Sequence, residues 1–176
     1  MVSLGLRFAL LKSRIKNGKQ PEQMALAEEA ITRGMELAKK ALDLELGGVM
    51  AAAFENPSAF ADEEGLEQGL LYVERQFLWG LFHEFVHEYP TPVNSYDRIK
   101  VLLINWLMKT RERSLEQARD EANAVEDLFN RDDTLFGIVS QFGKDAYYGK
   151  HSNGIAKVLK ALLQARSERL AKESSA

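Results

Sequence analysis

The residues best suited to chemistry stand together in the segment His83-Glu84-Phe85-Val86-His87. Two histidines four positions apart lie on the same face of a helix, so both rings can reach one metal ion. A glutamate beside the first histidine can act as general base toward a water molecule bound to that metal. One interpretation of the spacing is therefore a zinc site with His83 and His87 as ligands and Glu84 as the catalytic base.

This five-residue pattern resembles the H-E-x-x-H core motif of the zincin metallopeptidases. The resemblance implies a zinc-dependent hydrolase with zinc as its cofactor. Such a site needs a third protein ligand, and His151 is the only other histidine in the chain. The metal ligands of this hypothesis are His83 and His87, with His151 as a candidate third ligand beside numerous acidic residues, and its catalytic residue is Glu84.

The sequence around the motif favours a simpler interpretation. The acidic residue Glu88 follows the second histidine, and Pro90 must end the helix soon afterwards. On a helical wheel, Gly80, His83 and His87 share a face that lies outside the main apolar stripe. We therefore expect a polar helix face with two ordinary histidines. The alternative is a polar groove in which Gly80 lets another group approach closely.

Other catalytic and cofactor-binding patterns are missing from the sequence. The absence of cysteine excludes a disulfide scaffold, a thiolate zinc site, an iron–sulfur cluster and a cysteine nucleophile. The chain has no glycine-rich phosphate loop and no G-x-S-x-G nucleophile elbow. Apart from zinc under the hydrolase hypothesis, no cofactor is expected.

Helices must position these residues, because apolar side chains recur every three to four positions along the chain. Of the 176 residues, 45% are hydrophobic and 28% are charged, the balance of one globular domain. We predict an all-α fold, a single helical bundle of about six or seven helices over 1–176, with a short polar tail from about 173. The helices are expected at about 4–15, 21–46, 62–88, 94–110, 114–129, 133–143 and 152–172, with a short apolar run at 49–54. Gly47-Gly48 and Gly143 are the expected ends of the second and sixth of these helices. Ser114 with Gln117 is a candidate capping box, and Asp132 or Asp133 is expected to cap the sixth helix.

The third predicted helix is the most apolar, and we expect it at the centre of the bundle. The aromatic side chains expected in the core are Phe77, Trp79, Phe82, Phe85 and Trp106. The segment 147–154 reads as a polar loop with two tyrosines. It is either a recognition loop or a plain connection whose tyrosines pack on the core.

The net charge of −3 conceals a strong pattern along the chain. Residues 1–20 carry five basic and no acidic side chains; 21–143 carry 11 basic and 23 acidic ones; 144–176 carry seven basic and three acidic ones. Basic termini lying side by side would form a positive patch. The overall pI of about 5.7 nevertheless argues against a nucleic-acid surface.

These observations predict the protein's partners and location. We expect another protein as partner, which includes a second copy of the chain in a homodimer, and we expect neither nucleic acid nor a membrane span. The longest uncharged stretch, 134–143, is about half of the roughly 20 residues that a spanning helix needs. No secretory signal pattern is present, so we expect a cytoplasmic protein.

Two functions follow as hypotheses. The first is a non-enzymatic protein-interaction or regulatory domain with an acidic surface, such as an adaptor, a chaperone or an immunity-type binder. The alternative is a zinc-dependent hydrolase that uses the motif at 83–87.

Overall fold

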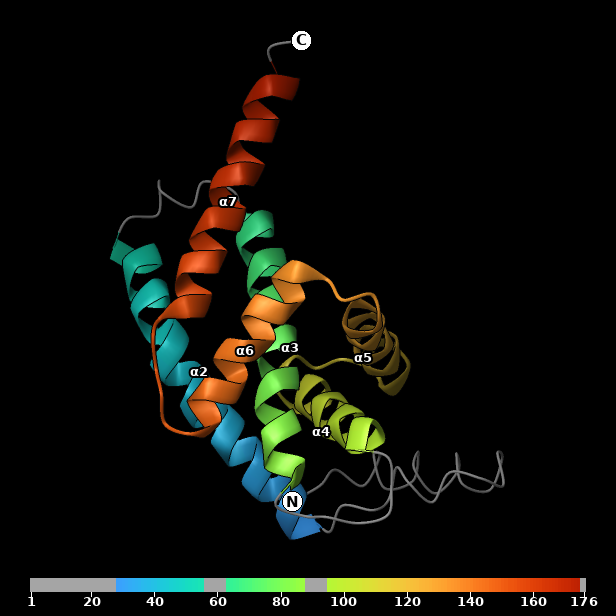
Figure 1. Ribbon diagram of the computed structural model, residues 1–176. Helices are drawn as coiled ribbons and strands as arrows, with labels where there is room; N and C mark the ends of the chain where they lie inside the picture. The colour runs from blue at the N-terminus through green and yellow to red at the C-terminus, as the bar shows by residue number, and fades with distance from the viewer. Residues whose placement is uncertain (1–27, 56–62, 88–94, 175–176) are drawn as a thin grey trace.

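The computed structural model describes residues 28–55, 63–87 and 95–174. These residues form an all-α bundle, as predicted (Figure 1). Its helices are α2 (Glu28–Glu55), α3 (Glu63–His87), α4 (Ser95–Thr110), α5 (Leu115–Asn130), α6 (Thr134–Tyr147) and α7 (Gly154–Glu173). The predicted helix at 4–15 and the predicted breaks at 56–58 and 89–93 lie outside the described residues.

Helix α3 is the central element, as its apolar sequence predicted. It contacts each of the other five described helices, with α2 and α7 on one side and α4 and α5 on the other (Figure 1). The five aromatic side chains expected in the core, Phe77, Trp79, Phe82, Phe85 and Trp106, are all buried. Burial of large apolar side chains on this one helix therefore organises the bundle.

The closest contact in the bundle is between the backbones of α3 and α6. A Cβ atom on Gly80 would overlap the carbonyl oxygen of Ser140, and one on Gly143 would overlap the carbonyl oxygen of Phe77. Gly80 thus does allow a close approach, but the approaching group is α6 itself. The prediction that Gly143 ends its helix was wrong, because α6 continues to Tyr147. Gly143 lies inside the helix, where the absence of a side chain lets α6 pack closely against α3.

The prediction that Gly47-Gly48 ends the second helix was also wrong, since α2 continues to Glu55. A glycine in a helix interior costs about 1 kcal/mol relative to alanine, but it can adopt helical dihedral angles without strain. Before the two glycines, α2 packs a continuous face on the core through Ala38, Ala41, Leu42 and Leu46. Once this packing has formed the helix, extending it through the two glycines costs less than starting a new helix.

Side-chain caps mark the helix starts around α5 and α6. Ser114 and Gln117 form the predicted capping box at the start of α5. Of the two candidate caps for α6, Asp133 is the one used, and its carboxylate accepts a hydrogen bond from the Phe136 nitrogen at 2.8 Å. These caps fix the turns that join α4 to α5 and α5 to α6.

Helix α7 begins against the core and ends away from it. Ile155 and Leu159 are fully buried, whereas residues 167–174 are exposed. In Figure 1 its last turns project beyond the other helices. No helix in the described part of the chain combines the length and the apolar character that crossing a membrane requires.

Candidate functional site

The two motif histidines lie side by side at the end of α3. The ring centroids of His83 and His87 are 4.9 Å apart, as their spacing on one helix face requires. The side chain of His83 is 25% exposed, and His87 is exposed to solvent. The polar helix face that the sequence predicted is therefore present, although its first histidine is half-buried.

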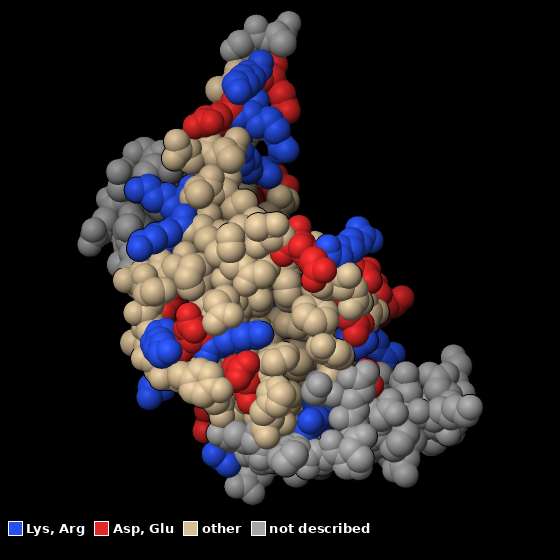
Figure 2. All heavy atoms as spheres, viewed as in Figure 1, with Lys and Arg blue, Asp and Glu red and all other residues tan. Residues whose placement is uncertain are grey.

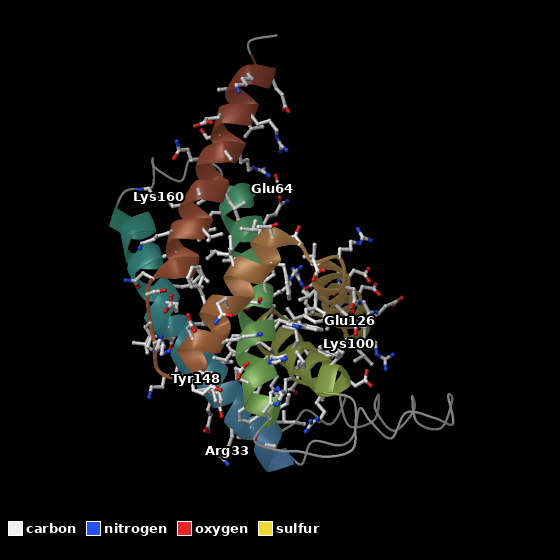
Figure 3. The ribbon with its side chains drawn as sticks, in the orientation of Figure 1. Arg33, Glu64, Lys100, Glu126, Tyr148 and Lys160 are labelled. Carbon is white, nitrogen blue, oxygen red and sulfur yellow. The ribbon has the colours of Figure 1, made fainter. Side chains whose placement is uncertain are left out.

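His83 belongs to a chain of hydrogen bonds that reaches α6. Its Nδ1 lies 3.0 Å from Oε1 of Glu84. The other carboxylate oxygen, Oε2, accepts a hydrogen bond from the hydroxyl of Tyr148 at 2.9 Å. Tyr148 follows α6 directly and lies at the lower end of that helix in Figure 3. Glu84 thus connects the end of α3 to the end of α6.

The surroundings change the pKa values of all three groups. Burial lowers the pKa of His83, and the positive charge of Lys144 lowers it further, against the opposing effect of Glu84. Burial alone would raise the pKa of Glu84, but the hydrogen bonds from Tyr148 and His83 outweigh it and lower that pKa. The bond to Glu84 raises the pKa of Tyr148. At neutral pH the site therefore contains a neutral imidazole beside an ionised carboxylate.

The third histidine lies in a different place. His151 follows α6 in the connection to α7, and its Nδ1 is 3.4 Å from Oε1 of Glu45 on α2. The same carboxylate oxygen accepts a hydrogen bond from the Ser152 nitrogen at 3.1 Å. Glu45 is 1% exposed, so this contact holds the α6–α7 connection against α2.

These positions bear directly on the zinc hypothesis. Among the described residues, no three His, Cys, Asp or Glu side chains are close enough together to hold a metal ion. His83 and His87 have each other but no third ligand there, and Nδ1 of His83 and both oxygens of Glu84 already have hydrogen-bond partners. The described side chains therefore do not fit a catalytic zinc site, which requires three protein ligands.

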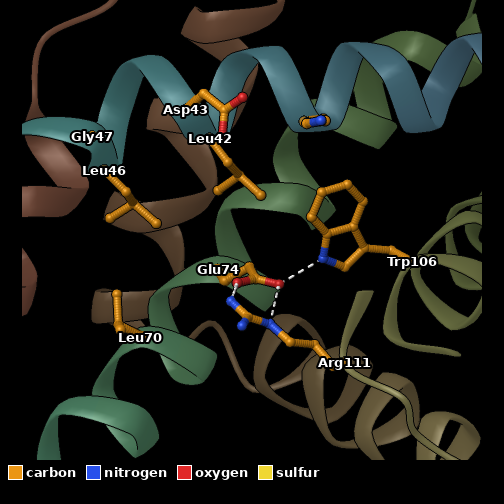
Figure 4. A pocket seen from close by; sticks show the side chains of 9 residues that line it. Leu42, Asp43, Leu46, Gly47, Leu70, Glu74, Trp106 and Arg111 are labelled. Atoms are coloured by element: carbon orange, nitrogen blue, oxygen red, sulfur yellow. Dashed lines mark hydrogen bonds and ion pairs between the residues drawn. The ribbon is translucent and has the colours of Figure 1, made fainter. Parts of the chain in front are cut away.

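A second polar site lies in a pocket between α2, α3 and the end of α4 (Figure 4). Its volume is about 460 Å³, and Leu42, Leu46 and Leu70 form part of its walls. At its base, Glu74 accepts hydrogen bonds from Nε1 of Trp106 at 2.6 Å and from Nε of Arg111 at 3.2 Å.

The Glu74 carboxylate is almost completely buried, so it depends on these partners. Nη2 of Arg111 also donates to its second oxygen, which makes the ion pair bidentate. The hydrogen bonds that Arg111 donates to Glu74 raise the pKa of Arg111. This arrangement anchors the segment after α4 to the central helix, and its first role is structural.

A third feature is the surface of α5, whose two faces differ in charge. Ala118, Ala122 and Val125 are buried on the inner face. Glu116, Asp120 and Asp127 follow the same period on the opposite face and are exposed. Within the described part of the chain these three carboxylates form no ion pair. In Figure 2 the edge formed by α5 carries several acidic side chains.

Other acidic residues of α5 hold the helix in place. Glu126 pairs with Lys100 of α4 at 2.8 Å, and Figure 3 shows the two side chains pointing toward one another. Glu121 pairs with Arg75 of α3 at 3.0 Å and with Arg113 at 2.9 Å. The helix therefore uses its inward acidic residues for attachment and leaves the outward ones free for other contacts.

Sequence reasoning singled out the motif residues but missed the groups that surround them. From the sequence, Tyr148 is only part of the predicted loop at 147–154, and Glu74 has no predicted role. A signal for Glu74 was present, because a carboxylate within the most apolar helix must have a buried partner. No local pattern pairs it with Arg111, which is 37 positions away.

The sequence matches no protein-family model, and neither a curated protein nor a solved structure is significantly similar to it.

Proposed function

We propose that this protein is a non-enzymatic protein-interaction domain that presents the outward face of α5 to a basic partner. The observation that carries the proposal is the row of exposed carboxylates at Glu116, Asp120 and Asp127. They project from one side of a single helix and lack ion-pair partners among the described residues. A row of like charges repels itself, and a basic surface would relieve that repulsion.

The attachment of α5 supports the same proposal. The ion pairs of Glu121 and Glu126 hold the helix to α3 and α4, and Phe129 packs 6.1 Å from Trp79 between ring centroids. A rigid helix loses little conformational entropy when it binds, so its charges are already in place for a partner. Binding through exposed charges depends on ionic strength, because salt screens such contacts.

The experiment that tests the proposal compares two triple variants in an affinity capture from native lysate. The variant E116Q/D120N/D127N removes three charges from the proposed surface. The control E36Q/D43N/E67Q removes three exposed charges from α2 and α3, so the change in net charge is the same. We expect a partner that the wild-type protein and the control retain, that added salt releases, and that the α5 variant loses. Equal capture by all three proteins would refute the proposal.

The second candidate is the zinc-dependent hydrolase. The rings of His83 and His87, 4.9 Å apart, could supply two ligands, whereas a third is missing among the described residues. Its requirement is specific: about one zinc ion for each chain, lost in His87→Ala while the helical content is unchanged. Elemental analysis of both purified proteins makes the comparison. Wild-type protein purified in the presence of zinc but without bound metal would exclude this candidate.

A further inference from the structure

A pocket of about 310 Å³ lies beside His83, between the end of α3, the α5–α6 turn and α6. The rings of Trp79, Phe129 and Phe136 form its apolar side. His83 and Lys144 line it as well, and Asp132 lies at the α5–α6 turn. An aromatic wall with a few polar groups is the usual composition of a small-molecule site. The proposed interaction surface on α5 uses none of these side chains.

The aromatic wall is rigid. The ring centroids of Phe129 and Phe136 are 6.0 Å apart, and those of Trp79 and Phe136 are 6.4 Å apart; each pair is packed edge to face. Trp79 and Phe136 are buried, so their positions are set by the core. A flat apolar ring could pack against this wall without moving it.

His83 lines the pocket, and one nitrogen of its ring is a hydrogen-bond acceptor. An ionised carboxylate only accepts hydrogen bonds, so the proton between His83 and Glu84 belongs to Nδ1 of the imidazole. In the neutral ring, Nε2 then carries a lone pair. The hydroxyl of Tyr148 holds the carboxylate from its other side and so keeps this orientation. The pocket therefore contains an oriented acceptor that suits a hydroxyl donor.

Lys144 supplies a positive charge that acts on the Glu84 carboxylate at longer range, without forming an ion pair with it. It is half-buried at the last turn of α6, and within residues 28–55, 63–87 and 95–174 it forms no ion pair. Of the two acidic side chains in the pocket, Asp133 is occupied as the cap of α6. Asp132 lies at the start of α6, about three helical turns from Lys144. A carboxylate in the pocket would therefore supply the direct ion pair that Lys144 lacks among these residues.

We propose that this pocket binds a small aromatic hydroxy acid. The carboxylate would pair with Nζ of Lys144, the hydroxyl would donate to Nε2 of His83, and the ring would lie against Phe129 and Phe136. The combination of one cation, one acceptor and an aromatic wall selects this class over simple fatty acids, which lack the hydroxyl and the ring. The assignment uses His83 without a metal and is independent of the proposed function.

A matched pair of probes tests this assignment. 3-Phenyllactate carries the carboxylate, the hydroxyl and the ring, and 3-phenylpropionate lacks only the hydroxyl. Titration of each into the full-length protein, followed by amide chemical shifts in NMR spectra, reports both the affinity and the location. We expect saturable shifts at residues of α6 and the end of α3. Binding of the hydroxy acid should be about tenfold tighter, from one additional hydrogen bond.

Three variants separate the contacts. Lys144→Gln should weaken both probes about tenfold or more, because it removes the charged contact. His83→Phe should remove the preference for the hydroxy acid while 3-phenylpropionate still binds. Lys150→Gln changes an exposed lysine outside the pocket and should have no effect. Their amide spectra without ligand establish that each variant is folded.

The results that would overturn the proposal are equally definite. If neither probe binds saturably to the folded wild-type protein, the assigned ligand class is excluded. Binding that Lys144→Gln leaves intact would show that the probes bind nonspecifically and would overturn the assignment. Chemical shifts confined to residues outside the pocket would have the same meaning. Equal affinity for the two probes would exclude the role given to His83.

Discussion

The contact between α3 and α6 leads to the most demanding prediction about the fold, the effect of Gly143→Ala. The added methyl group would overlap the carbonyl oxygen of Phe77 and lie 2.8 Å from the Leu81 nitrogen. Both neighbours are backbone atoms of the central helix, so neither can rotate away. The two helices must separate, and this disturbs the packing along their whole interface.

The magnitude follows from two opposing effects. Overpacking of this kind costs about 3 kcal/mol, the upper part of the usual range, because the clash is with backbone. Alanine regains about 1 kcal/mol through its higher helix propensity. The net loss is about 2 kcal/mol, which lowers the melting temperature of a chain this size by roughly 4–8 °C.

Gly137→Ala is the matched control on the same helix. No atom lies within 4 Å of a Cβ built at Gly137, so the substitution brings only the gain in helix propensity. It should raise the melting temperature by roughly 2–4 °C. Thermal and urea unfolding followed by far-UV circular dichroism measures both variants. A Gly143→Ala protein as stable as wild type, or stabilised like Gly137→Ala, would refute the close contact of α3 and α6.

Three further predictions concern individual side chains. Glu74→Ala leaves the Trp106 N–H unpaired and should lower the free energy of unfolding, measured in urea, by about 3 kcal/mol. Glu74→Gln keeps an acceptor there and should lower it less. Equal losses in the two variants would contradict the hydrogen-bond network around Glu74. Asp133→Ala removes the cap of α6 and should lower the free energy of unfolding by about 1 kcal/mol in the same assay. Asp133→Asn can still cap the helix and should lower it little. An alanine variant as stable as wild type would contradict the capping hydrogen bond. The pKa of His83 is lowered in the folded state, so the unfolded chain binds more protons between that pKa and about 6.5, and stability should fall as pH drops through this window. Urea unfolding at several pH values should show that the free energy of unfolding falls less with decreasing pH in His83→Gln than in wild type. Equal losses in the two proteins would contradict a half-buried, neutral His83 ring.

Periodicity predicted the helices where packing and local preference agree. The capping box at Ser114 and the central position of α3 followed from patterns within one segment. The two errors both concerned glycines. The sequence predicts helix ends at Gly47 and Gly143, whereas both lie inside helices, and Gly143 does so at the close contact with α3. A single sequence does not show whether a glycine ends a helix or makes room for a neighbouring one.

The candidate site was predictable only in part, for a similar reason. The spacing of His83 and His87 indicated one helix face correctly. The partners that determine the chemistry come from other helices: Tyr148 lies 64 positions from Glu84, and Lys144 reaches the pocket from α6. Such long-range contacts depend on how α3 and α6 pack, which no local spacing encodes. The acidic middle of the chain was visible, but not its division into paired and unpaired carboxylates on α5.

A site-specific photo-crosslink tests the proposed interaction function most directly. A photoreactive phenylalanine derivative would replace Ala124, which is exposed on the acidic face of α5, or Ala161, which is exposed on α7. The proposal predicts that irradiation in native lysate links a partner to position 124 but not to position 161. It also predicts that E116Q/D120N/D127N abolishes the link. No product at position 124, or a product that the neutralised protein still forms, would contradict binding through α5.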